Sequence, residues 1–338
     1  MPASSSSRSA RMALALALLA APTCAVSGPW HDDGPVAVRL VSPWLVAPRG
    51  AELALGLEVA LDPGWHIYWL NSGDAGYPPR LDFGATPGLV TAELRFPVPH
   101  RYDLPGKLVA FGYGERVVYP VTLRGTFGDT PTLDVTGTVD YVVCAGECIP
   151  FTTHLELVQP FGETARPDAE TQPQLAAWSS RVPTPAPEGT ATGRLLERSD
   201  AGGTLEIAFA GLPEEPTDLF FAPHELVELG RPVALAVRGD DRGDRRHRFA
   251  VPFAWKVRPS GAPPELGLEW TLAFGESGWT GRTGVPLGAA SAPATQPSGP
   301  ITPTDPAPLT WPWRVVLAAT ALGLVWALWP RAKGGPRP

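Results

Sequence analysis

The stretch "VDYVVCAGECIPFTTHLEL", Val139 to Leu157, places a pair of cysteines between two apolar, strand-like runs. Valine, tyrosine, isoleucine, phenylalanine and threonine dominate both runs, and these residue types are enriched in β-strands. The chain has 338 residues and only 3 cysteines. An isolated Cys-x-x-x-Cys pair in β-type sequence therefore needs a reason of its own.

The sequence around this pair predicts an all-β fold. Short apolar runs of strand length, several of them alternating, are separated by proline and glycine turns. This pattern favours a β-sandwich over residues 29–162 and a second, smaller β-sandwich domain over 190–287. The segment between them, 163–189, reads as a linker with one short helix near Gln172 to Arg181.

The N-terminus predicts export. Arg8 and Arg11 precede an apolar run from Met12 to Ala21 that is short for a membrane span, and small residues follow it. This is the layout of a secretory signal peptide, which we assign to residues 1–28. Cys24 lies near its end and is either lipidated or removed with the signal.

The C-terminus predicts a membrane anchor. Residues 288–310 form a Pro/Ala/Ser/Thr-rich stalk, and an apolar run from Val315 to Trp329 follows, bracketed by tryptophans. We expect a single transmembrane helix over 311–330 and a cytoplasmic basic tail over 331–338; the alternative is a buried or amphipathic terminal helix. The bulk of the chain would then lie in the periplasm, tethered to the bacterial inner membrane by one pass.

Charge argues against one class of partner. The formal net charge is −7, and it becomes −9 once Arg8 and Arg11 leave with the signal. No basic patch suggests nucleic-acid binding, and no motif calls for an organic cofactor. The mixed-charge cluster from Arg238 to Arg248 is typical of a solvated hairpin loop.

Three interpretations of the cysteine pair follow from chemistry. Two cysteines this close in an exported protein tend to form a disulfide. As a structural clip it is weak, because closing a loop of about five residues stabilises by about 2 kcal/mol, against about 4.7 for a 100-residue loop. The remaining interpretations are redox exchange and a metal site.

The metal interpretation would be copper binding. Thiolates and an imidazole suit copper, and His154 follows Cys148 by six positions. However, the only methionines are Met1 and Met12, so the exported part offers no thioether ligand. His154 would also lie about 20 Å along an extended strand. His66 and His100 have no spacing relation to the pair.

Three ordered blocks carry a resemblance to a known family. These are "DPGWHIYWLNSGDAGYPPRLDF", "FPVPHRYDLPGKLVAFGYGERVVYPVTL" and "VDYVVCAGECIPFTTHLEL". They resemble the periplasmic N-terminal domain of the DsbD-type protein-disulfide reductases, most of all the ScsB-like branch. The resemblance covers about Val36 to Gln159, and "DLFFAP" in the second domain also resembles a region of ScsB-like proteins.

The resemblance implies an immunoglobulin-like sandwich and assigns roles to residues. Cys144 and Cys148 would be the redox-active pair, with Cys148 forming mixed disulfides with partners. The family shields its cysteines with an aromatic-bearing loop, and "FGYGE" falls at that place. Phe111 or Tyr113 would then be the shielding side chain; the alternative is an ordinary glycine-rich hairpin.

The resemblance also implies partners. Family members go on into a multi-helix electron-conducting membrane domain, whereas this sequence holds one apolar helix and no second cysteine pair. A membrane thiol transporter or a thioredoxin-like protein would therefore donate electrons. Oxidised periplasmic proteins, such as those of cytochrome c biogenesis, would accept them. The alternatives are a copper-binding or delivery protein and a non-catalytic scaffold with a structural disulfide.

Overall fold

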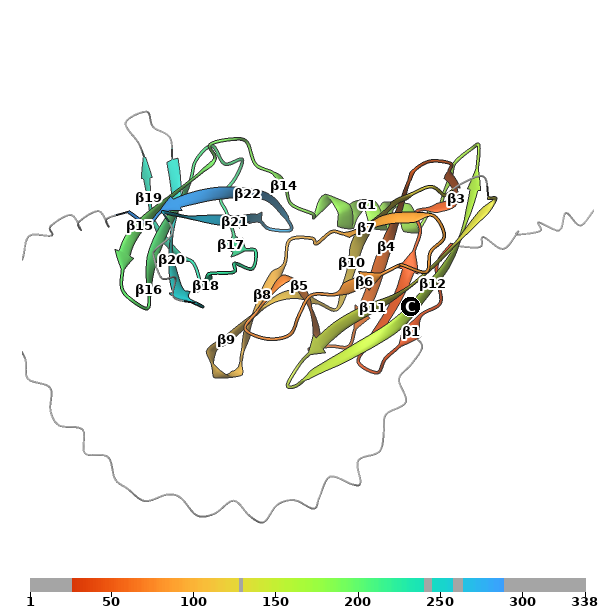
Figure 1. Ribbon diagram of the computed structural model, residues 1–338, viewed down its shortest axis with the longest axis horizontal. Helices are drawn as coiled ribbons and strands as arrows, with labels where there is room; N and C mark the ends of the chain where they lie inside the picture. The colour runs from red at the N-terminus through yellow and green to blue at the C-terminus, as the bar shows by residue number, and fades with distance from the viewer. Residues whose placement is uncertain (1–25, 128–129, 240–244, 258–263, 289–338) are drawn as a thin grey trace, which may run out of the picture. The chain divides into compact units, whose positions relative to one another are not determined.

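The computed structural model describes residues 26–127, 130–239, 245–257 and 264–288, and most of these residues are β-strand (Figure 1). Within them the only α-helix is α1, Thr171–Ser180. The predicted all-β class is therefore confirmed. The strands form four sheets, two on either side of α1 in the sequence.

The first sandwich consists of a five-stranded sheet in the order β1-β2-β4-β10-β7 and an eight-stranded sheet in the order β13-β3-β12-β11-β5-β9-β8, with β6 paired to β11. Buried apolar side chains from both sheets form one core cluster. The strands of this sandwich are β1 His31–Asp32, β2 Val36–Val41, β3 Trp44–Pro48, β4 Glu52–Leu61, β5 His66–Gly73, β6 Arg80–Asp82, β7 Leu89–Leu94, β8 His100–Leu104, β9 Leu108–Gly114, β10 Arg116–Gly125, β11 Thr132–Cys144, β12 Cys148–Gly162 and β13 Arg166–Pro167.

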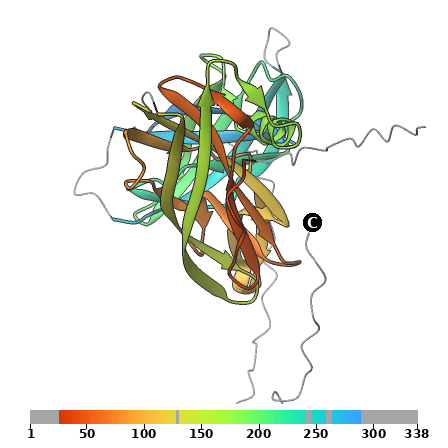
Figure 2. The same cartoon turned by 90° about the vertical axis from the view of Figure 1, so that its right-hand side faces the viewer.

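The long hairpin of β11 and β12 contains the stretch quoted at the start. It pairs without a register shift from Thr132 opposite Pro160 to Cys144 opposite Cys148, and Figure 2 shows it running the length of the sandwich. Buried and exposed residues alternate along most of β11, as expected of a sheet with one solvated face. At the end of β11, however, every residue from Tyr141 to Cys144 is buried. This end of the sheet is therefore covered on both faces.

The second sandwich has its own core. A four-stranded sheet in the order β14-β22-β21-β17 faces a five-stranded group, β15-β16-β20-β18 with β19 paired to β20. Of the charged cluster predicted as a hairpin loop, Arg238 and Gly239 lie at the end of β19 and Arg245 to Arg248 at the start of β20, which pairs antiparallel with β19; residues 240–244 lie outside the described residues. The strands are β14 Thr184–Pro185, β15 Ala191–Arg198, β16 Gly202–Phe209, β17 Asp218–Phe221, β18 Val227–Leu229, β19 Val233–Gly239, β20 Arg245–Trp255, β21 Glu265–Phe274 and β22 Ser277–Pro286.

The segment predicted as a linker is fastened to both sandwiches. Before α1, β13 pairs with β3, and after it β14 pairs with β22. Leu175 of α1 packs against Val41 and Val118 of the first sandwich. The predicted helix, Gln172 to Arg181, is observed one residue earlier. What the sequence reads as a spacer is therefore part of the packed structure.

The predicted terminal segments lie mostly outside the described residues. Of the signal peptide assigned to 1–28, the last three residues are described, and Gly28 N–H donates to the Leu40 carbonyl beside an isolated bridge of Ser27 with Val41. The stalk beyond Gly288, the transmembrane helix at 311–330 and the tail lie outside the described range. Among the described helices, none has the length and apolar character needed to cross a bilayer.

Candidate functional site

The two cysteines form a disulfide at the closed end of the β11–β12 hairpin. Their Cα atoms are 4.2 Å apart, and Ala145 N–H donates to the Glu147 carbonyl across the turn. The two residues are unequally accessible: Cys144 is 2 % exposed, whereas Cys148 is exposed to solvent. An attacking group from solvent therefore meets Cys148 first.

A tyrosine hydroxyl contacts the buried sulfur. On the neighbouring strand β5, His66 lies directly opposite Cys144, and strand alternation places Tyr68 on the same face two residues later. The Tyr68 hydroxyl donates to Cys144 Sγ at 2.7 Å and lies 3.7 Å from Cys148 Sγ. Burial raises the pKa of Tyr68 to about 12, so the hydroxyl keeps its proton at neutral pH.

His66 is the second polar side chain beside Cys144. It is 3 % exposed, its ring stacks on Tyr102 of β8 at 4.9 Å between centroids, and it meets the edge of Tyr68 at 5.3 Å. Its Nε2 has no hydrogen-bond partner among the described residues. Burial lowers the pKa of His66, which keeps the imidazole neutral at pH 7.

Apolar and aromatic side chains enclose the buried half of the disulfide. Tyr68 and Cys144 form a cluster of their own, separate from the main core, together with Ala110, Val142, Tyr77, Tyr102 and Leu104. Gly76 lies so close to Tyr68 that a Cβ there would be 2.1 Å from the ring. The loop after β5 therefore packs closely against the Tyr68 ring.

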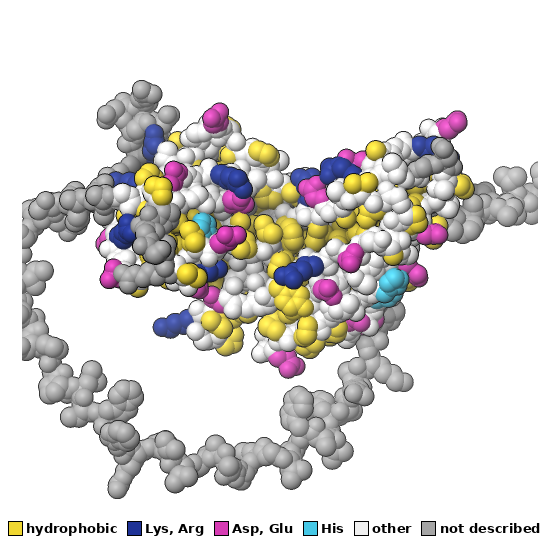
Figure 3. Space-filling model, in the orientation of Figure 1, with side chains coloured by type: hydrophobic (Ala, Val, Ile, Leu, Met, Phe, Trp, Pro, Cys, Tyr) yellow, Lys and Arg dark blue, Asp and Glu magenta, His cyan; other side chains and the backbone are white. Residues whose placement is uncertain are grey.

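The same face also exposes apolar surface. Leu70 of β5 is 42 % exposed and Leu108 of β9 is 45 % exposed. Figure 3 shows hydrophobic side chains gathered on this face over the region of β5 and β8, toward the end of β11. Exposed apolar side chains on strands of this sheet suit contact with another protein.

The predicted shielding residues do not lie beside the cysteines. Tyr113 is 3 % exposed, its hydroxyl donates to the Pro97 carbonyl at 2.6 Å, and its ring belongs to the main core. Phe111 packs on Phe220 of the second sandwich, with ring centroids 5.4 Å apart. Side chains alternate along β9, and Ala110 belongs to the cluster around the disulfide, so Phe111 and Tyr113 point to the opposite face. In this structure the nearby aromatic groups are instead Tyr68, Tyr77 and Tyr102.

Of the histidines considered as copper ligands, His66 lies beside the cysteine pair. His154 is exposed on β12 and lies opposite Thr138, well along the hairpin from Cys148. Across the described part of the chain, no three side chains of histidine, cysteine, aspartate or glutamate are grouped so that they could hold a metal ion. The site has two sulfurs, one tyrosine hydroxyl and one neutral imidazole.

Sequence alone did not reveal Tyr68. Alternation in "HIYWL" places His66 and Tyr68 on one face and Ile67 and Trp69 on the other, which the structure shows as site and core faces respectively. What the sequence could not supply is that β5 is the strand beside β11. That adjacency turns a buried tyrosine into a donor to the disulfide.

Comparison with known proteins finds a family match and a similar fold. Residues 37–160 match the family described as "Thiol:disulfide interchange protein DsbD, N-terminal". The fold is similar to the crystal structure of the N-terminal periplasmic domain of ScsB from Proteus mirabilis, with a TM-score of 0.57 and 18% identity, covering 78% of this chain and 98% of that one. No curated protein gives a significant match. The resemblance inferred from the three sequence blocks is thus confirmed: residues 37–160 match the family of DsbD N-terminal domains.

Proposed function

We propose that this protein is a thiol–disulfide exchange module that passes reducing equivalents from a reduced thiol partner to oxidised exported proteins. The observation that carries the proposal is the unequal environment of the two sulfurs. Cys148 is exposed, whereas Cys144 is buried and accepts a hydrogen bond from Tyr68. This is the arrangement needed by an attacked sulfur and its leaving group.

Reduction begins when a partner thiolate attacks Cys148 Sγ. A bond forms between the partner sulfur and Cys148, the Cys144–Cys148 bond breaks, and Cys144 leaves with the electron pair as a thiolate. The Tyr68 hydroxyl, already 2.7 Å from Cys144 Sγ, donates to the developing charge. A hydrogen bond to a charged group is worth about 1.5–3 kcal/mol, which favours Cys144 as the leaving sulfur.

The partner's second thiolate then completes the transfer. It attacks the partner sulfur in the mixed disulfide, forms the partner's disulfide and releases Cys148 as a thiolate. Two electrons have moved to the pair, and the two thiolates take up protons according to the pH. Delivery to an oxidised protein is the reverse sequence, with Cys148 as the attacking thiolate.

Partner and location belong to the proposal. The exposed Leu70 and Leu108 provide apolar surface on which a thioredoxin-like protein or a membrane thiol transporter can dock. The apolar segment at 311–330 and the signal-like N-terminus support a single-pass inner-membrane protein with its bulk in the periplasm. The immunoglobulin-like fold implied by the family is part of the same proposal.

Trapping of mixed disulfides tests the exchange chemistry. Cys144→Ala leaves Cys148 able to attack but removes the sulfur that would resolve the complex, so this variant should accumulate mixed disulfides in acid-quenched cells. Cys148→Ala, with its remaining sulfur buried beside Tyr68, is the matched control and should accumulate few. Equal trapping by both variants, or by neither, would contradict the proposal.

Trapping and two further measurements distinguish redox exchange from a structural disulfide. A purely structural bridge would show no trapped partners, a midpoint potential well below about −300 mV and full function in the double cysteine variant. Copper delivery is the other alternative, and among the described residues no group of three or more histidine, cysteine, aspartate or glutamate side chains could hold a metal ion.

A further inference from the structure

Strand β8 carries two functions on its two faces. Tyr102 and Leu104 point to the disulfide side, where Tyr102 stacks on His66. Arg101 and Asp103 alternate with them and contact the second sandwich instead. One short strand thus contacts the disulfide site through one face and the second sandwich through the other.

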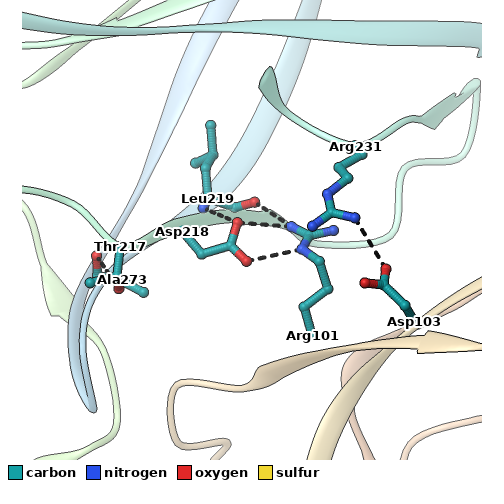
Figure 4. A network of polar contacts seen from close by, with 7 residues as sticks. All are labelled: Arg101, Asp103, Thr217, Asp218, Leu219, Arg231 and Ala273. Carbon is teal, nitrogen blue, oxygen red and sulfur yellow. Dashed lines mark hydrogen bonds and ion pairs between the residues drawn. The ribbon is translucent and has the colours of Figure 1, made fainter. Parts of the chain in front are cut away.

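Arg101 is the stronger of the two contacts. Its Nε and Nη2 donate to Asp218 Oδ2 and Oδ1, both at 2.9 Å, and Nη2 also donates to the Leu219 carbonyl at 3.3 Å (Figure 4). The Arg101 side chain is only 9% exposed, and its guanidinium lies 4.8 Å and 5.2 Å from the ring centroids of Phe111 and Phe220. A partly buried, bidentate pair of this kind fixes both direction and distance.

The contact between Arg231 and Asp103 supports it more weakly. Arg231 Nη1 donates to Asp103 Oδ1 at 3.1 Å, but the side chains are 58% and 71% exposed (Figure 4). Exposed pairs contribute little, typically about 0–1 kcal/mol. The ion pair of Arg101 with Asp218 is therefore the main contact that fixes β8 against the second sandwich.

Strand β17, which carries Asp218, also contacts the other two strands of the site. Phe220 lies 5.8 Å from Trp69 of β5 and 5.4 Å from Phe111 of β9, measured between ring centroids. The Asn71 side-chain amide of β5 donates to the Phe221 carbonyl at 2.9 Å. One strand of the second sandwich thus touches β5, β8 and β9, which together carry His66, Tyr68 and Tyr102.

We propose that the second sandwich is a working part of the redox site, and that Asp218 is a positioning residue for it. By holding Arg101, Asp218 fixes β8 and keeps Tyr102 stacked on His66 beside Cys144. The aromatic packing around Tyr68, and with it the hydrogen bond to Cys144 Sγ, then depends on a carboxylate in another sandwich. This inference rests on the proposed exchange function and adds a residue that sets the reduction potential of the Cys144–Cys148 pair.

The test is the redox equilibrium of the full chain with glutathione. Asp218→Ala leaves Arg101 buried without its carboxylate and should loosen β8. We expect the equilibrium constant for reduction to fall about tenfold, the size of one lost hydrogen bond to a charged sulfur. For a two-electron couple this corresponds to a potential about 30 mV more negative.

Glu206→Gln is the matched control. Glu206 is a buried carboxylate of the second sandwich that also binds two guanidiniums, those of Arg194 and Arg248, which both belong to the second sandwich. It should lower stability without moving the equilibrium constant by more than about twofold. Phe220→Leu, which keeps apolar volume but removes the ring beside Trp69 and Phe111, should shift the constant in the same direction as Asp218→Ala and covers the case in which that variant fails to fold.

The outcomes distinguish this inference from the function on which it rests. If the wild-type disulfide does not equilibrate with glutathione in the folded protein, the exchange function itself fails. If the wild type equilibrates and the folded Asp218→Ala and Phe220→Leu variants match it within twofold, the positioning role is overturned. A shift in the Glu206→Gln control equal to that in Asp218→Ala would also overturn it, since the effect would then be one of general stability.

Discussion

At the scale of single residues, Tyr68 determines how unequal the two sulfurs are. A buried tyrosine whose pKa is raised to about 12 is a permanent donor at neutral pH. It can stabilise a thiolate on Cys144 without bringing a charge of its own into the apolar cluster, which a lysine or arginine would do at a desolvation cost. Its role as a donor follows from the position of β5 beside β11, which the structure shows.

Replacing Tyr68 by phenylalanine removes the donor and keeps the ring. The loss of about 1.5–3 kcal/mol of stabilisation should raise the pKa of the Cys144 thiol by roughly one to two units. Thiolate absorbance in the reduced protein, followed over pH, measures this shift directly, and exchange with a small dithiol should slow by at least about tenfold.

Tyr113→Phe is the control for that substitution. It also removes a buried hydroxyl, the one that donates to the Pro97 carbonyl, but from the core face of β9. It should lower stability while leaving the thiol titration unchanged. A larger effect on exchange from Tyr113→Phe than from Tyr68→Phe would restore Tyr113 as the residue that controls access to the cysteines.

At the scale of elements, the sequence located the site more accurately than its surroundings. The apolar runs on both sides of the cysteines predicted strands, and β11 and β12 are those strands. Phe111 and Tyr113, predicted as shielding residues, lie within strand β9, where their side chains face the main core and not the disulfide. The sequence shows that side chains alternate along a strand, but not which set faces the core. In β9 that depends on packing with Phe220 of the second sandwich and with Tyr119 of β10.

The loop after β5 provides a second prediction. Gly76 has φ of +71°, and its missing side chain leaves room for the Tyr68 ring. Gly76→Ala should therefore push the ring away from Cys144 and slow exchange by an amount similar to Tyr68→Phe. The measurement is the rate of reduction by a small dithiol in the native protein.

Gly64→Ala separates this effect from backbone strain. Gly64 has φ of +85°, but a Cβ there would meet nothing within 4 Å. This variant should lose roughly 1–2 kcal/mol of stability through the left-handed backbone alone and keep the wild-type exchange rate. If both glycine variants slow exchange equally, the contact of Gly76 with Tyr68 is not what matters.

At the scale of the whole molecule, each sandwich contains a buried glutamate held by two arginines. Glu58 on β4 accepts from Arg39 and Arg116, and Glu206 on β16 accepts from Arg194 and Arg248. Burial alone would raise the pKa of each carboxyl, but the arginine hydrogen bonds outweigh it and the net pKa is lowered. Both sandwiches therefore depend on an ionised carboxylate.

The sign of the pH dependence follows. A carboxyl whose pKa is lower in the folded than in the unfolded protein contributes stability that is fully present above the unfolded value. Below the ordinary glutamate pKa of 4.5 this contribution is lost progressively, until the pH has fallen through the lowered folded pKa. Urea unfolding between pH 7 and pH 3 should show this loss.

Glu58→Gln should be less stable at pH 7 by roughly 1–3 kcal/mol and should lose less of its remaining stability in acid than the wild type. Glu52→Gln is the control: Glu52 also binds an arginine, Arg124, but both side chains are about half exposed, so its effect should stay below about 1 kcal/mol. Identical acid profiles for the wild type and Glu58→Gln would contradict the role given to Glu58.

Helix α1 also shows what sequence patterns could not supply at this scale. Its residues, "TQPQLAAWSS", have little apolar periodicity, so the segment read as a linker with a short helix. Leu175 nevertheless closes a small cluster with Val41 and Val118, and the Gln174 amide donates to Glu58. These contacts join positions more than fifty residues apart in sequence, and no local pattern encodes them.

This attachment has a consequence for where the first sandwich ends as an independently folding unit. The family match stops at residue 160, but α1 covers Val41 and Val118, and the Arg181 carbonyl accepts from Val98 N–H. A fragment of residues 26–162 should therefore be less stable to urea than one of residues 26–183 by roughly 2–4 kcal/mol, the cost of losing a buried leucine and its neighbours. Equal stability would show α1 to be dispensable. If the longer fragment is the more stable one, the segment that folds cooperatively includes α1 and is longer than the segment that the family model matches.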